Sequence, residues 1–312
     1  MINSPIVLFV YNRPIHTRLC IEALALNVEA INSDLFIYSD YPANPNDIIL
    51  VNQVRDYINA VKGFRTVTVV NRDKNLGLAA SIVSGVTEVL DGHECVIVLE
   101  DDLVVSECFL RFMNDALFCY KDDPRVGSIH GYVYPVSDHL PETFFLRGAD
   151  CWGWATWPRA WKMMRLDGRL LLGELVSRNL EGAFDLGGAY PYTKMLRNQI
   201  KGKNNSWAIR WHASLYLRGM LTLYPGKSLV QNIGHDGSGV HSAVSNDLQV
   251  CLSHVSPTVG GIEVLENQVA LNSVANFLTK THSGILAIIK RSLSKIHASF
   301  QSYLKIIMNG SI

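Results

Sequence analysis

The sequence lacks the patterns that mark a disulfide-bonded, secreted or membrane-spanning protein. Its six cysteines form no CxxC pair, and several lie in apolar stretches, where a buried free thiol is the ordinary interpretation. No apolar run reaches the ~20 residues needed to cross a bilayer. No basic segment followed by an apolar stretch and a small-residue cleavage site precedes the strand-like run Pro5 to Val10. We therefore expect a cytoplasmic protein in a reducing compartment.

An excess of charge of one sign is also lacking. The 28 Lys and Arg residues balance 28 Asp and Glu residues, so the overall charge indicates no nucleic-acid partner. Hydrophobic residues make up 48% of the 312 residues, which is enough for a sizeable core. Any electrostatic function must therefore come from local clusters of charged residues.

The first half of the chain alternates strand-like and helix-like segments. Apolar strand-like runs occur at 6–10, 35–38, 67–70 and 96–99, and helical spacing occurs at 17–26, 47–61, 78–90 and 107–120. This alternation predicts an α/β fold with a mainly parallel central sheet covered by helices on both faces. Ligands of such sheets bind at the carboxyl ends of the strands, which is where the polar clusters of this sequence fall.

The acidic triplet Glu100-Asp101-Asp102 follows the apolar strand at 96–99. Carboxylates held together at the end of a buried strand are costly to keep ionised unless a cation joins them. Mg²⁺ and Mn²⁺ prefer such oxygen ligands, commonly with substrate phosphates completing the coordination shell. The triplet therefore predicts a divalent-cation site, and the alternative is that these acids cap the following helix.

Other polar residues follow the neighbouring strands. Arg13 and Asp40 come after the first and second strands, where an arginine can stack on a base or bind a phosphate and an aspartate can accept from a base N–H. Arg72 and Asn75 precede the helix at 78–90, whose N-terminus suits a diphosphate. The segment 72–78 is neither a Walker A motif nor GxGxxG, which disfavours dinucleotide binding. The alternative is that these are ordinary turn and surface residues.

Two segments of the irregular middle region are candidates for acceptor binding and catalysis. Trp152 and Trp154 follow Asp150 and could form an aromatic wall for a sugar, or could simply pack in the interior. The Gly-rich segment 233–241 carries Asp236 and His241 and has the backbone freedom to close over a ligand. His241 could ligate the cation or have a structural role.

Together these pieces resemble the GT-A glycosyltransferases. The likeness is to inverting enzymes that begin N-glycan branching by adding N-acetylglucosamine, and to bacterial sugar transferases of surface-polysaccharide loci. It covers roughly residues 5 to 241. The motifs that carry it are Val10 to Pro14, Tyr38 to Asp40, Asn75 to Leu78, Val98 to Leu103 and Cys151 to Trp154.

The resemblance implies roles for particular residues. Asp102 would bind the Mn²⁺ or Mg²⁺ that bridges the diphosphate of a nucleotide-sugar, Asp101 would approach the ribose, and Glu100 would lie behind it. Arg13 and Asp40 match positions that contact uracil, so the donor is expected to be UDP-linked. The implied fold has a Rossmann-like nucleotide-sugar half at 1–125, an acceptor half at 126–260 and a C-terminal helical extension at 261–312.

The general base is where the sequence departs from the family. Eukaryotic relatives place a catalytic aspartate beside a Trp in a segment similar to Ser206 to Trp211, and no carboxylate occurs there in this chain. Inversion needs a base that deprotonates the acceptor hydroxyl. Asp150 and Asp236 are the candidates, and we favour Asp150.

The expected function is therefore transfer of a hexosyl or N-acetylhexosaminyl group to a glycan or lipid-linked acceptor in surface-polysaccharide synthesis. One alternative is a nucleotidyltransferase acting on sugar phosphates, which would usually have a Gly-rich basic loop where Tyr11 to Pro14 stands here. The other is a non-catalytic carbohydrate-binding protein, which would not need the acidic triplet.

The C-terminal region carries an apolar stripe at helical spacing, from Ile289 to Ile307, and no acidic residue after Glu266. A basic amphipathic helix of this kind is typical of contact with an anionic membrane surface. We expect peripheral association with the inner membrane face, and the alternative is packing on the protein's own core or on another subunit.

Overall fold

The computed structural model describes residues 3–237 and 246–281, and an eight-stranded sheet forms its centre. Strands β7 and β8 run opposite to the other six, so the sheet is mixed but mostly parallel. The strand order is β3 (Thr66–Asn71), β2 (Asp34–Ser39), β1 (Ile6–Val10), β4 (Val96–Glu100), β8 (Trp154–Thr156), β6 (Val126–His130), β9 (Leu221–Pro225), β7 (Thr143–Arg147). A separate antiparallel pair joins β5 (Leu103–Val105) to β10 (Val230–Asn232).

The predicted α/β alternation of the first half is confirmed. Helices α1 (Pro14–Ala25), α2 (Ile48–Ile58), α3 (Leu78–Leu90) and α4 (Phe109–Cys119) lie where helical spacing predicted them. Helix α1 begins three residues earlier than expected, because Pro14 occupies its first turn, where a missing N–H costs nothing. The short strand β5 was not predicted.

Strand β1 shows why the sheet is covered on both faces. Ile6, Leu8 and Val10 pack in one core with α1, α2 and α4, whereas Val7 and Phe9 pack in a second core with α3 and α9. Successive side chains of a strand point to opposite faces, so five apolar residues in a row need an apolar partner layer on each side.

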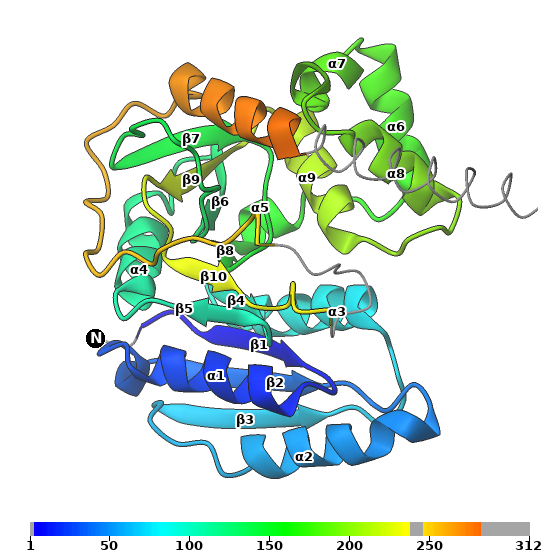
Figure 1. The fold of residues 1–312 in the computed structure, drawn as a ribbon, viewed down its shortest axis with the longest axis vertical. Coiled ribbons are helices and arrows are strands. Elements are labelled where there is room, and N and C mark those ends of the chain that lie inside the picture. Colours follow the sequence, from blue (N-terminus) through cyan, green and yellow to red (C-terminus); the bar gives the residue numbers. More distant parts are fainter. Residues whose placement is uncertain (1–2, 238–245, 282–312) are drawn as a thin grey trace, which may run out of the picture.

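The second half adds helices around the antiparallel edge of the sheet. Figure 1 shows most of them gathered at one end of the molecule, at the upper right. They are α5 (Pro158–Trp161), α6 (Gly168–Ser177), α7 (Glu181–Phe184), α8 (Tyr192–Ile200) and α9 (Trp207–Leu217). Three short 3₁₀ turns complete the described elements: η1 (Ala30–Asn32), η2 (Pro45–Asp47) and η3 (Leu186–Gly188).

A cluster of tryptophans holds α5 and α9 on the sheet. The ring of Trp154 lies 5.4 Å from Trp207, 5.7 Å from Trp161 and 5.9 Å from Trp211. Trp154 is 1% exposed. The prediction that Trp154 helps to form an acceptor wall is therefore wrong, because its side chain is buried between the sheet and two helices.

The chain ends, within the described residues, in a helix at 268–281 that lies over β7 and β9 (Figure 1). Ala270, Val274 and Leu278 pack there with Phe144 and Tyr224. This helix is therefore part of the core. The predicted apolar stripe from residue 289 to residue 307 lies outside the described residues.

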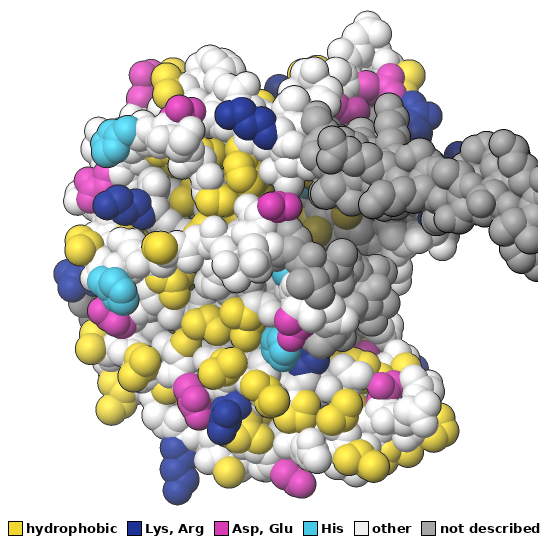
Figure 2. Space-filling model, in the orientation of Figure 1, with side chains coloured by type: hydrophobic (Ala, Val, Ile, Leu, Met, Phe, Trp, Pro, Cys, Tyr) yellow, Lys and Arg dark blue, Asp and Glu magenta, His cyan; other side chains and the backbone are white. Residues whose placement is uncertain are grey.

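The outer side of α1 carries exposed apolar side chains beside the charged pair Arg18–Glu22. Figure 2 shows hydrophobic side chains spread across this face of the molecule. Ile15 is 66% exposed and Leu26, which follows the helix, is 73% exposed. Scattered apolar side chains of this kind are common and assign no partner by themselves. Within the described ranges, no helix combines the length and apolarity needed to cross a membrane.

The Asp34 carboxylate gives a test of how β2 is held to β3. Asp34 is buried and accepts hydrogen bonds from Arg65 (2.9 Å from Nε) and from Thr66 Oγ1 (2.5 Å). Burial alone would raise the pKa of Asp34, but these two donors outweigh it and lower the pKa below its ordinary value.

Replacing Asp34 with Asn should therefore lower the free energy of unfolding at pH 7 by about 1.5–3 kcal/mol. A depressed folded-state pKa contributes stability above the unfolded pKa and loses it as the pH falls, so the difference should shrink near about pH 3.5. Urea unfolding at both pH values measures it. Asp123→Asn, which breaks the exposed pair with Arg125, should cost less than about 1 kcal/mol. Equal losses in the two variants would contradict this account.

Candidate functional site

The site forms at the carboxyl ends of β1 and β4. These strands pair in parallel, with Phe9 opposite Glu100, so the residues that follow them emerge side by side. Arg13 Nη1 lies 3.0 Å from Asp102 Oδ2 and 4.0 Å from Asp101 Oδ1. The structure thus brings together an arginine and two carboxylates that are about ninety positions apart in the sequence.

The charge at this edge is not balanced. Burial and then the charges of Asp102 and Asp101 raise the pKa of Glu100 well above its ordinary value, and Arg13 offsets this only in part. Burial and the charge of Asp102 raise the pKa of Asp101 to about 7, although Arg13 and the Tyr11 N–H, which donates to Asp101 over 3.3 Å, oppose the shift. Among the described residues, the Glu100 carboxylate has no hydrogen-bond partner. One arginine thus faces three acids.

These carboxylate oxygens suit a divalent cation such as Mg²⁺ or Mn²⁺, whose remaining coordination positions are filled by a bound substrate and water. Within 3–237 and 246–281, no three His, Cys, Asp or Glu side chains converge as a ready-made metal cage. Mg²⁺ and Mn²⁺ commonly use only one or two carboxylates plus phosphate oxygens and water, so a complete cage is not required. Asp102, partly exposed and at the end of β4, is placed to supply such a ligand. The second predicted ligand, His241, lies outside the described residues.

The segment after β10 packs directly on Asp102. The Ile233 N–H donates to the Asp102 carbonyl oxygen over 2.8 Å. Gly234 approaches so closely that a Cβ there would overlap the Asp102 carboxylate. Two residues on, Asp236 Oδ2 lies 3.2 Å from His16 Nε2 on α1. This segment is therefore fastened to the acidic edge at one end and to α1 at the other.

Asp40 follows β2, as predicted, and its side chain is bound by backbone donors. Its buried carboxylate accepts hydrogen bonds from the backbone N–H groups of Tyr41 (2.9 Å), Leu76 (2.9 Å) and Gly77 (2.8 Å). Both oxygens are therefore used to tie the connection between β3 and α3 to the end of β2. In this arrangement Asp40 shapes the loop, while Oδ2, which accepts one bond, keeps a lone pair, so its contact with a base stays a prediction.

Arg72 and Asn75 also have partners in the surrounding loops. Arg72 lies over the Tyr38 ring, 4.9 Å from its centroid, and pairs with Glu88 of α3 at 3.3 Å. Asn75 donates to the carbonyl oxygen of Tyr41 over 2.5 Å. The structure therefore does not bring these two side chains to Arg13 and the acids.

Asp47 is a site-shaping residue that the sequence did not reveal. Its carboxylate accepts from the Tyr11 hydroxyl over 2.9 Å and from Asn12 Nδ2 over 2.8 Å. These bonds fix the turn that carries Arg13. Nothing in the local pattern around Asp47, which follows a Pro-Asn turn, indicates a contact with residues 35 positions away. The sequence pattern also gave no indication of His16 or Gly234, because their contacts with Asp236 and Asp102 join residues that are distant in the sequence.

Asp150 stands on the turn between β7 and β8. Its Oδ2 accepts from the Tyr134 hydroxyl over 3.1 Å, and its Oδ1 accepts from the Cys151 N–H over 3.0 Å. Burial raises the pKa of the Cys151 thiol, and so do the charges of Asp150, Glu100 and Asp102. All three carboxylates therefore lie within electrostatic range of one thiol. Trp152, next along the turn, is partly exposed.

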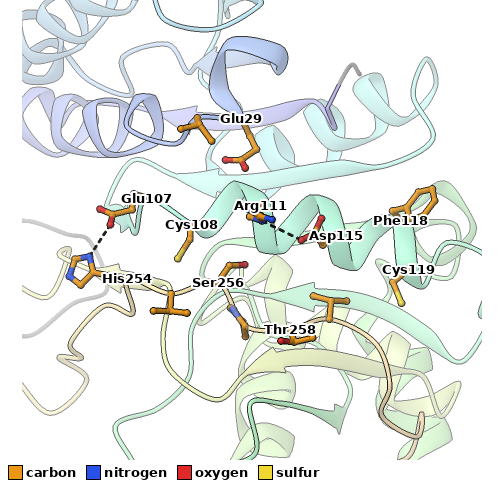
Figure 3. A pocket seen from close by; sticks show the side chains of 14 residues that line it. Glu29, Glu107, Cys108, Arg111, Asp115, Phe118, Cys119, His254, Ser256 and Thr258 are labelled. Atoms are coloured by element: carbon orange, nitrogen blue, oxygen red, sulfur yellow. Dashed lines mark hydrogen bonds and ion pairs between the residues drawn. The ribbon is translucent and has the colours of Figure 1, made fainter.

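A hollow of about 780 Å³ lies elsewhere, between α4, the end of α1 and the segment 254–259. Figure 3 shows its polar side chains engaged with one another: Glu107 pairs with His254 at 3.3 Å and Arg111 with Asp115 at 3.9 Å. None of the predicted site residues lines it. The acidic edge is the better candidate site because one arginine offsets the charge of its three acids only in part, whereas most charges in the hollow are paired.

No protein-family model and no curated protein matches this sequence. Solved structures that are similar in part include the mannosyltransferase PcManGT from Pyrobaculum calidifontis in complex with GDP-Man and Mn²⁺, at 13% identity over 43% of this chain and 37% of that chain, with a TM-score of 0.32. Another is S. aureus TarS, at 14% identity over 47% and 24%, with a TM-score of 0.31. Residues 1–349 of TarS in complex with UDP-GlcNAc match at 11% over 45% and 39%, with a TM-score of 0.32.

This chain therefore spans between 24% and 39% of the length of those structures. Likeness at these TM-scores carries no argument about function, so the conclusions below rest on the residues of this chain. The fold and the site together define an α/β protein whose acidic ligand edge lies at the carboxyl ends of parallel strands.

Gly234 tests whether the segment after β10 supports the acidic edge. In Gly234→Ala the added methyl group must displace the Asp102 carboxylate or the segment itself, so the free energy of unfolding should fall by about 1–3 kcal/mol. Gly173→Ala in α6 is the matched control, because nothing lies within 4 Å of its Cβ position and alanine favours a helix. Urea unfolding compares the two, and equal stability of both variants would show that the contact is absent.

Proposed function

We propose that this chain is a metal-dependent glycosyltransferase. It moves a hexosyl or N-acetylhexosaminyl group from a nucleotide-sugar, with UDP as the carrier, to a glycan or lipid-linked acceptor. The observation that carries the proposal is the pairing of Arg13 with Asp102 beside two further acids, Glu100 and Asp101, whose charge Arg13 offsets only in part. An edge of this kind, open to a cation and a diphosphate together, suits a nucleotide-sugar.

Asp102 and Arg13 have complementary roles in donor binding. Asp102 would hold Mn²⁺ or Mg²⁺, which would supply positive charge to stabilise the departing nucleoside diphosphate. Arg13, 3.0 Å from Asp102, orients the carboxylate and offers its remaining N–H groups to phosphate oxygens. Asp101 takes the position beside the ribose that the family resemblance implies, and Glu100 lies behind it.

Asp150 is the general base of the proposed reaction. The acceptor oxygen attacks the anomeric carbon as Asp150 takes the hydroxyl proton, and the bond from that carbon to the diphosphate oxygen breaks on the opposite face, which inverts the configuration. Asp150 is favoured over Asp236 because the carboxylate of Asp236 is paired with His16, whereas no described Lys, Arg or His forms an ion pair with Asp150. Trp152, partly exposed beside Asp150, offers an aromatic face to the acceptor.

The cellular setting is part of the same proposal. A lipid-linked acceptor for surface-polysaccharide synthesis would place the enzyme in the cytoplasm at the inner membrane face. The basic composition of the chain after Glu266, which has lysines and an arginine but no acid, supports contact with anionic lipid. Residues 1–125 then form the donor half, 126–260 the acceptor half and 261–312 the C-terminal extension. The helix at 268–281 packs on the core, and the basic sequence from Lys290 onward is the part that we propose to contact lipid.

Donor binding can be tested by thermal unfolding with a panel of nucleotides. A ligand that binds only the native state raises the melting temperature. We expect UDP or a UDP-sugar to raise it in the presence of Mn²⁺, and we expect EDTA or Asp102→Asn to abolish the shift. Asp115→Asn on α4, outside the site, should keep the shift.

The products distinguish the competing functions. Transfer that releases UDP supports a glycosyltransferase, whereas release of pyrophosphate would identify a nucleotidyltransferase. Glycan binding with no response to any nucleotide or metal would identify a carbohydrate-binding protein, and full activity in chelated enzyme would overturn the metal role.

Asp150→Asn tests the base. Because a general base contributes about 10²–10⁴-fold, kcat should fall by that factor while the Mn²⁺-dependent shift with UDP stays as in the wild type. Asp236→Asn, assayed in parallel, should keep more activity. Turnover by Asp150→Asn at the wild-type rate would show that Asp150 is not the base. Loss of turnover in Asp236→Asn alone would show that Asp236 is the base.

A further inference from the structure

We propose that Tyr134 is a positioning residue, whose hydroxyl orients the Asp150 carboxylate toward the acceptor. The inference deepens the proposed function and rests on Asp150 being the general base. The Tyr134 hydroxyl donates to Asp150 Oδ2 over 3.1 Å. Three further observations support the assignment: the rigidity of the turn under Asp150, the absence of a cation beside it, and the fixed placement of the Tyr134 ring.

The backbone on both sides of Asp150 is held in place. Gly148, at φ +94°, lies against the His212 ring, its N–H donates to Met220 and its carbonyl accepts from Thr222. On the other side, the Trp152 N–H donates to His130 Nε2 over 3.0 Å. With the turn fixed in this way, the direction of the carboxylate depends on its own side-chain torsions.

Two donors set those torsions. The Cys151 N–H donates to Oδ1 over 3.0 Å, and the Tyr134 hydroxyl donates to Oδ2. Each carboxylate oxygen can accept two hydrogen bonds, so both keep a free lone pair for a substrate proton. The Tyr134 bond is the one of the two that comes from a different part of the chain, and it therefore selects the rotamer.

The surroundings of Asp150 hold no cation among the described residues, because no Lys or Arg forms an ion pair with it. The titratable groups that face it are His130, Tyr132, Tyr134, Cys151, Tyr190, Tyr192, His212 and Tyr224. A neutral hydroxyl can orient a carboxylate while weakening it as a base less than a full positive charge would.

Tyr134 is itself fixed and remains a donor. Its ring lies edge-on to Tyr132 at 5.4 Å and 5.8 Å from Phe277 of the helix at 268–281. Burial and then the charge of Asp150 raise the pKa of Tyr134 well above its ordinary value, so the hydroxyl is a proton donor at neutral pH. The helix at 268–281 thus supports the base through one intervening ring.

The test compares Tyr134→Phe with Tyr132→Phe in the full chain. Each variant removes one hydroxyl from neighbouring rings, but the Tyr132 hydroxyl donates to the Leu248 carbonyl and not to Asp150. In Tyr134→Phe we expect kcat to fall about tenfold, which corresponds to ~1.4 kcal/mol, with KM for the nucleotide-sugar unchanged. The acidic limb of the pH–kcat profile should move to higher pH, because a donated hydrogen bond stabilises the charged carboxylate. Tyr132→Phe should change both quantities less.

A second readout does not need activity. Carbon-13 NMR of the aspartate carboxyl groups, with the Asp150 signal assigned by its loss in Asp150→Asn, follows the titration of Asp150 directly. A higher midpoint in Tyr134→Phe than in the wild type and Tyr132→Phe is the expected result. Identical midpoints in all three proteins would overturn the role of Tyr134, even in a protein that transferred no sugar. A raised midpoint with full turnover by Asp150→Asn would uphold the contact and overturn Asp150 as the base.

Discussion

Strand β1 pairs in parallel with β2 on one side and with β4 on the other, and the site depends on that pairing. Parallel neighbours end at the same edge, so Arg13 after β1 meets Asp101 and Asp102 after β4 without any loop having to reach across the sheet. This arrangement gathers several carboxylates in a partly buried place, where keeping them ionised costs free energy. Arg13 relieves that cost only in part, and the remaining charge makes the edge a candidate for a cation.

Side-chain hydrogen bonds and one close backbone contact fix the loops around the acidic edge. Asp47 binds the turn that carries Arg13, and Asp40 binds the backbone of the connection into α3. Gly234, in the segment after β10, lies against the Asp102 carboxylate. The carboxylates thus have two roles here: Asp40 and Asp47 each accept several hydrogen bonds and shape loops, whereas the triplet has fewer donors.

The second half of the chain supplies a different environment. Around Asp150 the neighbours are tyrosines, histidines and a thiol, and no described Lys or Arg pairs with it. These surroundings of Asp150 suit proton transfer, whereas the edge that carries Arg13 suits the binding of a charged diphosphate. The two environments approach each other at Cys151, whose thiol lies within electrostatic range of Asp150, Glu100 and Asp102. The helix at 268–281 belongs to this half, since Phe277 packs on Tyr134.

The sequence by itself determined the α/β alternation, the four strands and four helices of the first half, and the acidic edge after β4. These follow from period-two and helical patterns, which are local. Only the tertiary structure decided which of two similar tryptophans is buried, since Trp154 lies in β8 against two helices whereas Trp152 lies in the turn before it. It also decided that Asp40 is bound by backbone donors, that Asp236 pairs with His16, and that Asp47, Gly234 and Tyr134 shape the site. Each of these is a contact between residues distant in the sequence, and no local pattern encodes such a contact.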